Sequence, residues 1–393
     1  MNWSQVSLAS VCDKPQYGAI AKGSHQQIGP RFVRQTDIVL GRIDWSTVPY
    51  CDLSPSDFNK YSLRRGDLLI SRLGNGVGNA AIVQNANDAV FAGYLVRFRT
   101  LASKADPDFV GYQLQSDAWR QHVVGFRSGA AQPTLNAQQM GEFKFLLPPL
   151  HEQAAIAATL GALDDKIESN RRVISIASDL LDAIADRSSQ DLEGAPLSEL
   201  TYNSRSVVDP SRIGDELVDH FSLPAFDSAV WPERTPASAI MSNKLVVDRP
   251  SILISRLNPR FNRTWWVVPE GSVIALASTE FSCLSAETRP ELAALWLAVR
   301  DRYFRGELTH RVTGTSGSHQ RIRPDDLLSI EVPNTRQLSD AVKQRVLDLL
   351  DLIHIRRREI VRLTALRDGL LPELLSGRVR VLETPRAVRG VVT

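Results

Sequence analysis

Three glycines, Gly74, Gly76 and Gly78, lie in the stretch LGNGVGN with a spacing that could form a dinucleotide or methyl-donor loop. Such a loop needs a helix directly after it, so that the helix N-terminus faces the phosphates. The residues that follow, NAAIVQ, have the composition of a strand instead. The stretch therefore predicts a hairpin or bulged turn. The chain also has no GxxxxGK[ST] motif that could hold a nucleoside triphosphate.

Other residues with catalytic potential have incomplete patterns. The stretch HEQAA begins like a zinc-protease helix but has no second histidine. Asp164, Asp165 and Lys166 resemble the end of a nuclease motif, but they fall on a predicted helix, where outward positions are usually solvated. Leu147 occupies the place in LLPPLH where an amino-methyltransferase would have Asn or Asp before two prolines. We therefore expect a protein without an active site of its own.

The composition is that of an ordinary globular chain of two or three domains, with 43% hydrophobic residues, 23% charged residues and a net charge of +2. A local basic face remains compatible with so small a total charge. Cys12, Cys51 and Cys283 never form a CxxC pair, so neither a disulfide framework nor a zinc cluster is expected. The first residues have no apolar signal-peptide core, and no apolar run reaches the roughly 18 residues of a membrane span. We expect a cytoplasmic protein.

The chain repeats itself. The stretches GDLLISRLGNG (66–76) and PSILISRLNPR (250–260) share the string LISRL. FRSGAAQPTL (126–135) similarly resembles TGTSGSHQRI (313–322), and each is followed by an apolar segment ending in proline, FKFLLPPL and LLSIEVPN. VSLASV and PLSEL match near the start of each half. Four echoes in the same order predict two copies of one unit, each about 150 residues followed by a long helix.

The regions before the long helices, 1–149 and 188–333, have mixed character. Short strand-like runs such as DLLISRL, YLVRFRT, SILISRL and GSVIALAS alternate with turns. Short helices are expected at 107–122 and 290–304. The fold class is therefore predicted to be α+β, with two mostly β domains.

Two long segments, 150–187 and 334–377, carry apolar residues at alternating steps of four and three, which is a heptad seam, with one polar interruption in each at Asn170 and Arg356. The seam residues are Ile156, Leu160, Leu163, Ile167, Asn170, Ile174 and Leu181 in the first helix, and Val346, Leu349, Ile353, Arg356, Ile360 and Leu363 in the second. So narrow a seam needs one partner helix, and we expect the two to form an antiparallel coiled coil. The alternative is two surface helices on separate cores. Pro372 predicts a kink or break, and Gly377 the end of the second helix.

This plan resembles the specificity (S) subunit of type I restriction–modification enzymes over nearly the full length. The most diagnostic stretches are GDLLISRLG, SGAAQPTLN leading into FLLPPLHEQAAIAATLGALDDKI, and LRDGLLPELLSGRV. The second half departs from the pattern, with VPNTRQLSDAV where the first half has PPLHEQAAI.

The resemblance implies two target-recognition domains, 1–149 and 188–333, that each read one half of a bipartite, asymmetric DNA site. Helices 150–187 and 334–377 would be the spacer, and 378–393 a loosely ordered tail. It also implies two methyltransferase (M) subunits that use S-adenosylmethionine, and restriction (R) subunits that use ATP and Mg²⁺. The chain itself would bind no cofactor or metal. A helix of about 37 residues spans roughly 55 Å, so an antiparallel pair could serve half-sites about one DNA turn apart.

The residues expected to contact DNA lie in two pairs of polar loops. They are Arg72, Asn75, Asn79, Arg127, Gln132, Thr134, Arg256, Asn258, Arg260, Arg263, His319, Gln320 and Arg321. For Arg72 and Arg256 a salt-bridged framework role is an equal alternative, and for the loop residues it is turn chemistry. Trp265 and Trp266 are expected in the core. For the whole chain, the alternative function is a coiled-coil protein-interaction scaffold without DNA recognition; a fused methyltransferase is disfavoured by its missing motifs.

Overall fold

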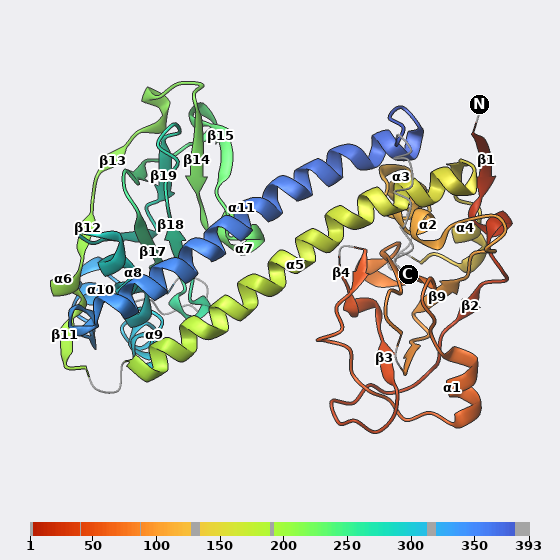
Figure 1. Cartoon of the computed structure of the whole chain (residues 1–393), viewed down its shortest axis with the longest axis horizontal. Helices are drawn as coiled ribbons and strands as arrows, with labels where there is room; N and C mark the ends of the chain where they lie inside the picture. The colour runs from red at the N-terminus through yellow and green to blue at the C-terminus, as the bar shows by residue number, and fades with distance from the viewer. Residues whose placement is uncertain are drawn as a thin grey trace, which may run out of the picture. The chain divides into compact units, whose positions relative to one another are not determined.

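The structure is a computed structural model that describes residues 3–39, 41–86, 88–126, 134–188, 192–312 and 320–381. It divides into two compact units: unit 1 comprises the chain up to Asp165 and from Thr364 onward, and unit 2 comprises Lys166–Leu363. Two long helices, α5 (Leu150–Ser188) and α11 (Asp340–Ser376), each contribute to both units (Figure 1). The mixture of helices and several sheets confirms the α+β class.

Unit 1 is built on an antiparallel sheet with strand order β2-β9-β6-β7. Its central strands β6 and β9 are entirely buried. Beside it, β1 pairs with β10, β3 runs parallel to β8, and β4 pairs with β5. The strands are β1 (Ser4–Ser7), β2 (Gln16–Tyr17), β3 (Arg31–Val33), β4 (Ile38–Val39), β5 (Arg42–Ile43), β6 (Leu68–Ser71), β7 (Ala80–Ile82), β8 (Ala89–Phe91), β9 (Leu95–Phe98) and β10 (Lys144–Leu147). The short helices are η1 (Leu8–Val11), η2 (Gln35–Asp37), α1 (Pro55–Tyr61), η3 (Gly74–Gly76), α2 (Pro107–Gln113), α3 (Asp117–Gly125) and α4 (Ala137–Gly141).

Unit 2 repeats this plan with a sheet of order β12-β20-β17-β18, beside a second sheet of order β13-β16-β19-β14-β15. The strands are β11 (Gly194–Pro196), β12 (Tyr202–Ser204), β13 (Val207–Val208), β14 (Leu217–Phe221), β15 (Glu233–Pro236), β16 (Lys244–Val246), β17 (Ser251–Ser255), β18 (Thr264–Val267), β19 (Ala275–Ser278), β20 (Phe281–Ser285) and β21 (Glu331–Pro333). The short helices are α6 (Leu197–Leu200), η4 (Pro210–Arg212), α7 (Leu223–Ala229), η5 (Ala237–Ala239), η6 (Pro259–Phe261), α8 (Arg289–Ala298), α9 (Arg302–His310), α10 (Pro324–Leu328) and η7 (Thr335–Gln337).

The internal repeat is confirmed by the order of the strands. The two LISRL strings form β6 and β17, which occupy the same place in their sheets, between β9 and β7 and between β20 and β18. The parallel pair β3–β8 likewise corresponds to β14–β19. The glycine-rich stretch after β6 forms the turn of the antiparallel β6–β7 hairpin, as predicted.

The two short helices predicted at 107–122 and 290–304 are each two helices, so these predictions were wrong in detail. Ser116 lies between α2 and α3 and is the N-cap of α3. Its hydroxyl accepts a hydrogen bond from the Trp119 backbone amide at 3.2 Å. Asp301 caps α9 in the same way, through the Tyr303 amide at 2.8 Å. A side chain that bonds the next backbone amides stabilises a new helix start.

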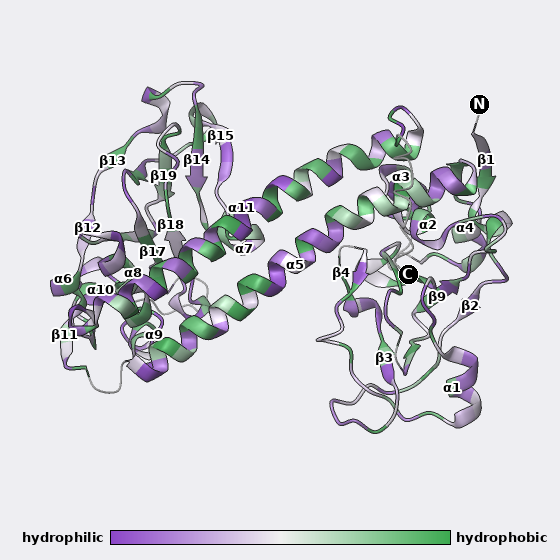
Figure 2. Cartoon of the chain, in the orientation of Figure 1, coloured by the Kyte–Doolittle hydropathy of each residue, from purple (hydrophilic) through white to green (hydrophobic). Residues whose placement is uncertain are grey.

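The two long helices pack against each other in antiparallel orientation. In unit 1, Ile156 and Leu160 of α5 share a core with Leu374 and Leu375 of α11. In unit 2, later residues of α5, including Leu181, share a core with earlier residues of α11. Apolar and hydrophilic residues alternate along both helices (Figure 2). Both cores also contain residues of the strands and short helices of their unit, so the seam is continuous with the core of each unit.

The polar seam positions Asn170 and Arg356 meet at one carboxylate. Arg356 Nη1 donates to Glu359 Oε2 at 2.9 Å, and Lys166 Nζ lies 3.4 Å from Oε1. The Arg356 hydrogen bond lowers the pKa of Glu359 against the effect of burial, and Asn170 and Lys166 lower it further. These polar groups lie within an otherwise apolar seam and favour a single register.

The end of α11 differs in part from expectation. The helix is not broken at Pro372 and continues to Ser376. Gly377 ends it, as predicted, with a left-handed φ of 73°. A Cβ at Gly377 would also lie 3.1 Å from the Trp3 ring, so both conformation and space favour glycine here.

Asp164 is buried, contrary to the expectation that outward helix positions are solvated. Tyr112 Oη donates to its Oδ2 at 2.8 Å, and Arg367 Nη1 donates to its Oδ1 at 3.0 Å. Burial and the neighbouring carboxylate raise the pKa of Tyr112. Asp165, by contrast, has a side chain that is 86% exposed. The buried carboxylate links α5, α11 and α2 within unit 1, which is a structural role.

Candidate nucleic-acid interface

The repeated arginines Arg72 and Arg256 occupy the same backbone position in their two units. Each follows the central strand of its sheet, and the amide of each donates to the neighbouring strand region, Arg72 to Tyr94 O at 3.0 Å and Arg256 to Glu280 O at 2.8 Å. The carbonyl of Arg72 accepts from the Leu135 amide at 2.9 Å, and that of Arg256 from Ile322 at 3.1 Å. The two polar loops of each unit are thus joined at the repeated arginine.

The side chains of these arginines are held by the framework, and neither forms a salt bridge to a residue that the structure describes. The Arg72 guanidinium lies over the Tyr17 ring, 4.9 Å from its centroid. Arg256 donates to the Thr279 carbonyl, and burial lowers its pKa, although Glu280 acts in the opposite direction. Both guanidinium groups are partly buried, so they support the loops beside them more directly than they face solvent.

In unit 1 the exposed candidates cluster around the hairpin turn. Asn75 and Asn79 are exposed, and so is Thr134, which lies beside the turn because its neighbour Leu135 is bonded to Arg72. Gly78 has a φ of 86°, and its carbonyl accepts from Trp119 Nε1 at 2.7 Å. The turn therefore presents amide and hydroxyl groups on a well-anchored backbone. Arg127 and Gln132 lie outside the described residues.

In unit 2 the corresponding turn presents cations around an aromatic ring. Asn258 and Asn262 adopt left-handed backbone conformations on either side of η6, which asparagine tolerates better than most residues. Phe261 between them is 54% exposed. The guanidinium carbons of Arg260 and Arg263 lie 4.8 and 4.9 Å from its ring centroid.

Arg260 and Arg263 have different surroundings. Arg263 forms a bidentate pair with Asp227, at 2.7 and 2.8 Å, and this hydrogen bonding lowers the pKa of Asp227. Arg260 is exposed and has no carboxylate partner among the described residues. Arg260 is thus the cation that the turn offers to solvent, and Arg263 braces the Phe261 ring while it is held by Asp227.

The second loop of unit 2 joins the same site. The Asn258 amide donates to the Gln320 carbonyl at 2.8 Å, and the exposed Arg321 pairs with Glu280 at 2.6 Å. His319 lies outside the described residues. Trp265 and Trp266 are buried, as predicted. Sequence reasoning missed Phe261, although an aromatic residue between two arginines was a signal for it.

The part of the chain that the structure describes holds no group of three or more His, Cys, Asp or Glu side chains that could bind a metal ion. No described helix is both long and apolar enough to cross a membrane.

These observations define a class of protein: an internally duplicated α+β chain with two long helices and a pair of anchored polar loops in each unit. Residues 3–176 match the family model described as the type I restriction modification DNA specificity domain. The resemblance inferred from the sequence is therefore confirmed for this part of the chain.

The chain is also similar to individual specificity subunits. The chain is 25% identical over 179 residues to the type I restriction enzyme MjaVIII specificity subunit of Methanocaldococcus jannaschii, covering 44% of this chain and 41% of that one. It is 22% identical over 160 residues to the EcoKI specificity subunit of Escherichia coli K12, covering 39% and 34%. These matches span less than half the length of either relative. The type I restriction-modification S subunit from M. genitalium has the same fold, with a TM-score of 0.64 over 95% of this chain and 96% of that one, at 14% identity.

Proposed function

We propose that this chain is the DNA-specificity subunit of a type I restriction–modification complex. Each recognition domain would read one half of a bipartite, asymmetric site, and the chain would contribute no catalytic group. The observation that carries this proposal is the repeated anchoring of two polar loops at Arg72 and Arg256. One framework that presents different side chains in its two copies is suited to two different half-sites.

The two turns differ in the chemistry that they offer to DNA. Unit 1 presents Asn75, Asn79 and Thr134, and asparagine forms a bidentate pair with adenine in the major groove. Unit 2 presents Arg260, which suits guanine or a phosphate oxygen. Each wrong base pair costs about 1–3 kcal/mol in such interfaces, so two half-sites multiply the discrimination.

The partners that we propose are double-stranded DNA, two M subunits that use S-adenosylmethionine, and R subunits that use ATP and Mg²⁺. The long helices supply surfaces that suit protein partners, since Ile176 of α5 and Ile355 of α11 are 68% and 56% exposed. Exposed apolar side chains on a helix commonly mark a protein interface when they gather in a patch.

Methylome sequencing of a host with and without this chain, in the presence of active cognate M subunits, tests the proposal. Loss of methylation at one bipartite motif is the expected result, and unchanged methylation would contradict it.

The exposed residues on the helices favour a second candidate, a protein-interaction scaffold without DNA recognition. That candidate predicts that the assembled complex shows no salt-dependent binding to duplex DNA.

A further inference from the structure

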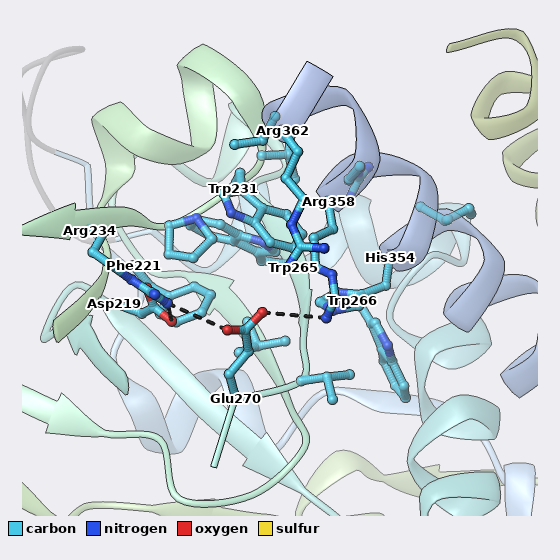
Figure 3. A pocket seen from close by; sticks show the side chains of 17 residues that line it. Asp219, Phe221, Trp231, Arg234, Trp265, Trp266, Glu270, His354, Arg358 and Arg362 are labelled. Carbon is cyan, nitrogen blue, oxygen red and sulfur yellow. Dashed lines mark hydrogen bonds and ion pairs between the residues drawn. The ribbon is translucent and has the colours of Figure 1, made fainter. Parts of the chain in front are cut away.

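Unit 2 contains a cavity of about 300 Å³ between its recognition domain and α11. This volume is at the lower end of the range of small-molecule sites. Figure 3 shows the labelled side chains around it, with Trp265 near Arg358 and Trp266 on the same side as His354 of α11.

The wall formed by the recognition domain is aromatic. Trp265 and Trp266 of β18 are buried, and the Trp265 ring makes an edge contact with Phe221 at 4.9 Å between centroids. Trp231, in the loop after α7, packs on His354 of α11 with ring centroids 5.2 Å apart. These contacts hold the rings in place. Trp231 is only partly buried, so it is the tryptophan of this wall with the most open ring face.

The charges that line the cavity are unbalanced. Four arginines face two carboxylates. Arg234 holds Asp219 through two hydrogen bonds of 2.9 Å, and Glu270 lies 3.6 Å from Arg234 and 3.5 Å from Arg358. Both carboxylates are therefore already engaged.

Arg357 is left without an anion. Its side chain has no hydrogen bond or ion pair to any residue that the structure describes, and the same holds for the more exposed Arg362. Burial lowers the pKa of Arg357 to about 10, and the neighbouring Arg300 acts in the same direction. Arg357 is only partly buried, and a guanidinium with reduced access to water is stabilised when an anion pairs with it. Since its planar fork matches phosphate oxygens, an anion from outside the chain would satisfy it.

We propose that this cavity binds a small aromatic anion of the nucleotide class, with the charged group on Arg357 and the ring against the tryptophan wall. A free nucleotide and a nucleotide within a DNA strand share this chemistry. The proposal does not depend on sequence reading by the polar loops, which lie elsewhere in the unit.

Titration of the full-length chain with three probes, followed by calorimetry and tryptophan fluorescence, tests this site. The probes are adenosine monophosphate, adenosine without the phosphate, and inorganic phosphate without the ring. We expect the monophosphate to bind at least tenfold tighter than either fragment and to quench tryptophan fluorescence. A short duplex that displaces the monophosphate would identify a strand nucleotide as the source, and lack of displacement would identify a free nucleotide.

Variants of α11 distinguish the site from general attraction to a basic protein. Arg357→Gln should weaken monophosphate binding at least tenfold, whereas Arg345→Gln, at an exposed position of the same helix outside the cavity, should leave it unchanged. Arg357→Met should also lose binding while its melting temperature stays the same or rises, because a partly buried charge without a carboxylate partner among the described residues is removed. The proposal is wrong if the wild-type chain binds none of the probes, or if the Arg345 variant loses as much binding as the Arg357 variants.

Discussion

Arg367 of α11 donates from Nη1 to Oδ1 of Asp164 on α5 at 3.0 Å, and Asp164 is only 7% exposed. Burial alone would lower the pKa of Arg367, but its hydrogen bonds to Asp368 and Asp164 raise it. The pair joins the two long helices within unit 1, and Tyr112 adds the recognition domain to the same carboxylate. Removal of one member of such a pair leaves the other charge poorly solvated.

Asp164→Asn is therefore expected to lower the free energy of unfolding by about 2 kcal/mol, because Arg367 loses its buried counter-charge. Denaturant unfolding of the full chain measures this. Asp165→Asn is the matched control, since the Asp165 side chain is 86% exposed, and it should change stability by less than about 0.5 kcal/mol. Equal losses in both variants would show that Asp164 does not hold the helices together.

Glu359 makes the helix pairing in unit 2 sensitive to acid. Its pKa in the folded chain is lowered, chiefly by Arg356, so its contribution to stability is complete above the unfolded value near 4.5 and is lost as the pH falls below it. Glu359→Gln should be less stable than the parent at neutral pH and converge with it in acid. Melting temperatures between pH 7 and pH 3 measure this difference. Asp179→Asn, at an exposed position of α5, should show no such convergence; a constant gap for the Glu359 variant would contradict the prediction.

The duplication and the paired helices were readable from the sequence because they depend on local patterns. The LISRL strands recur because β6 and β17 are buried in equivalent sheets, and a buried strand tolerates few side chains. The heptad steps identified the seam in the same way. The sequence also contains signals for the breaks before α3 and α9, because Ser116 and Asp301 are typical helix-capping residues. The predicted helices 107–122 and 290–304 ran through both of them.

Long-range contacts could not be read in this way. Burial of Asp164 depends on Tyr112 and Arg367, which lie far from it in sequence, and no helical pattern reveals which residue will cover an outward position. The same limit applies to Arg263, whose role as a brace depends on Asp227 of another segment. For the candidate site, the sequence therefore identified the loops but not which side chains in them stay free for a ligand.

Gly78 is expected to be essential for the unit 1 turn. Its φ is 86°, and a Cβ there would lie 2.7 Å from Val123, so Gly78→Ala should cost about 1–2 kcal/mol in stability and weaken recognition of one half-site. Gly76→Ala, where a Cβ would meet Asn79 Nδ2 at 3.5 Å, is the matched control. Urea unfolding and methylation at the complete motif measure the two effects. If both alanine variants behave alike, the left-handed turn is not what orders this loop.

Arg260 is the unit 2 side chain that we expect to contact DNA most directly. It is exposed, lies on the Phe261 ring and lacks a carboxylate partner among the described residues, whereas Arg263 is committed to Asp227. Arg260→Ala should weaken binding of the assembled complex to its motif by about 1–3 kcal/mol and relax selection within one half-site only, because a base contact carries that much discrimination. Competition with single-base variants of the duplex measures both effects.

Arg249→Ala is the control for this prediction. It removes an exposed arginine of the same unit that pairs with Asp248, and it should leave base selection intact. A uniform loss of affinity in the Arg260 variant, with a smaller salt dependence and unchanged base preference, would instead assign Arg260 to a phosphate.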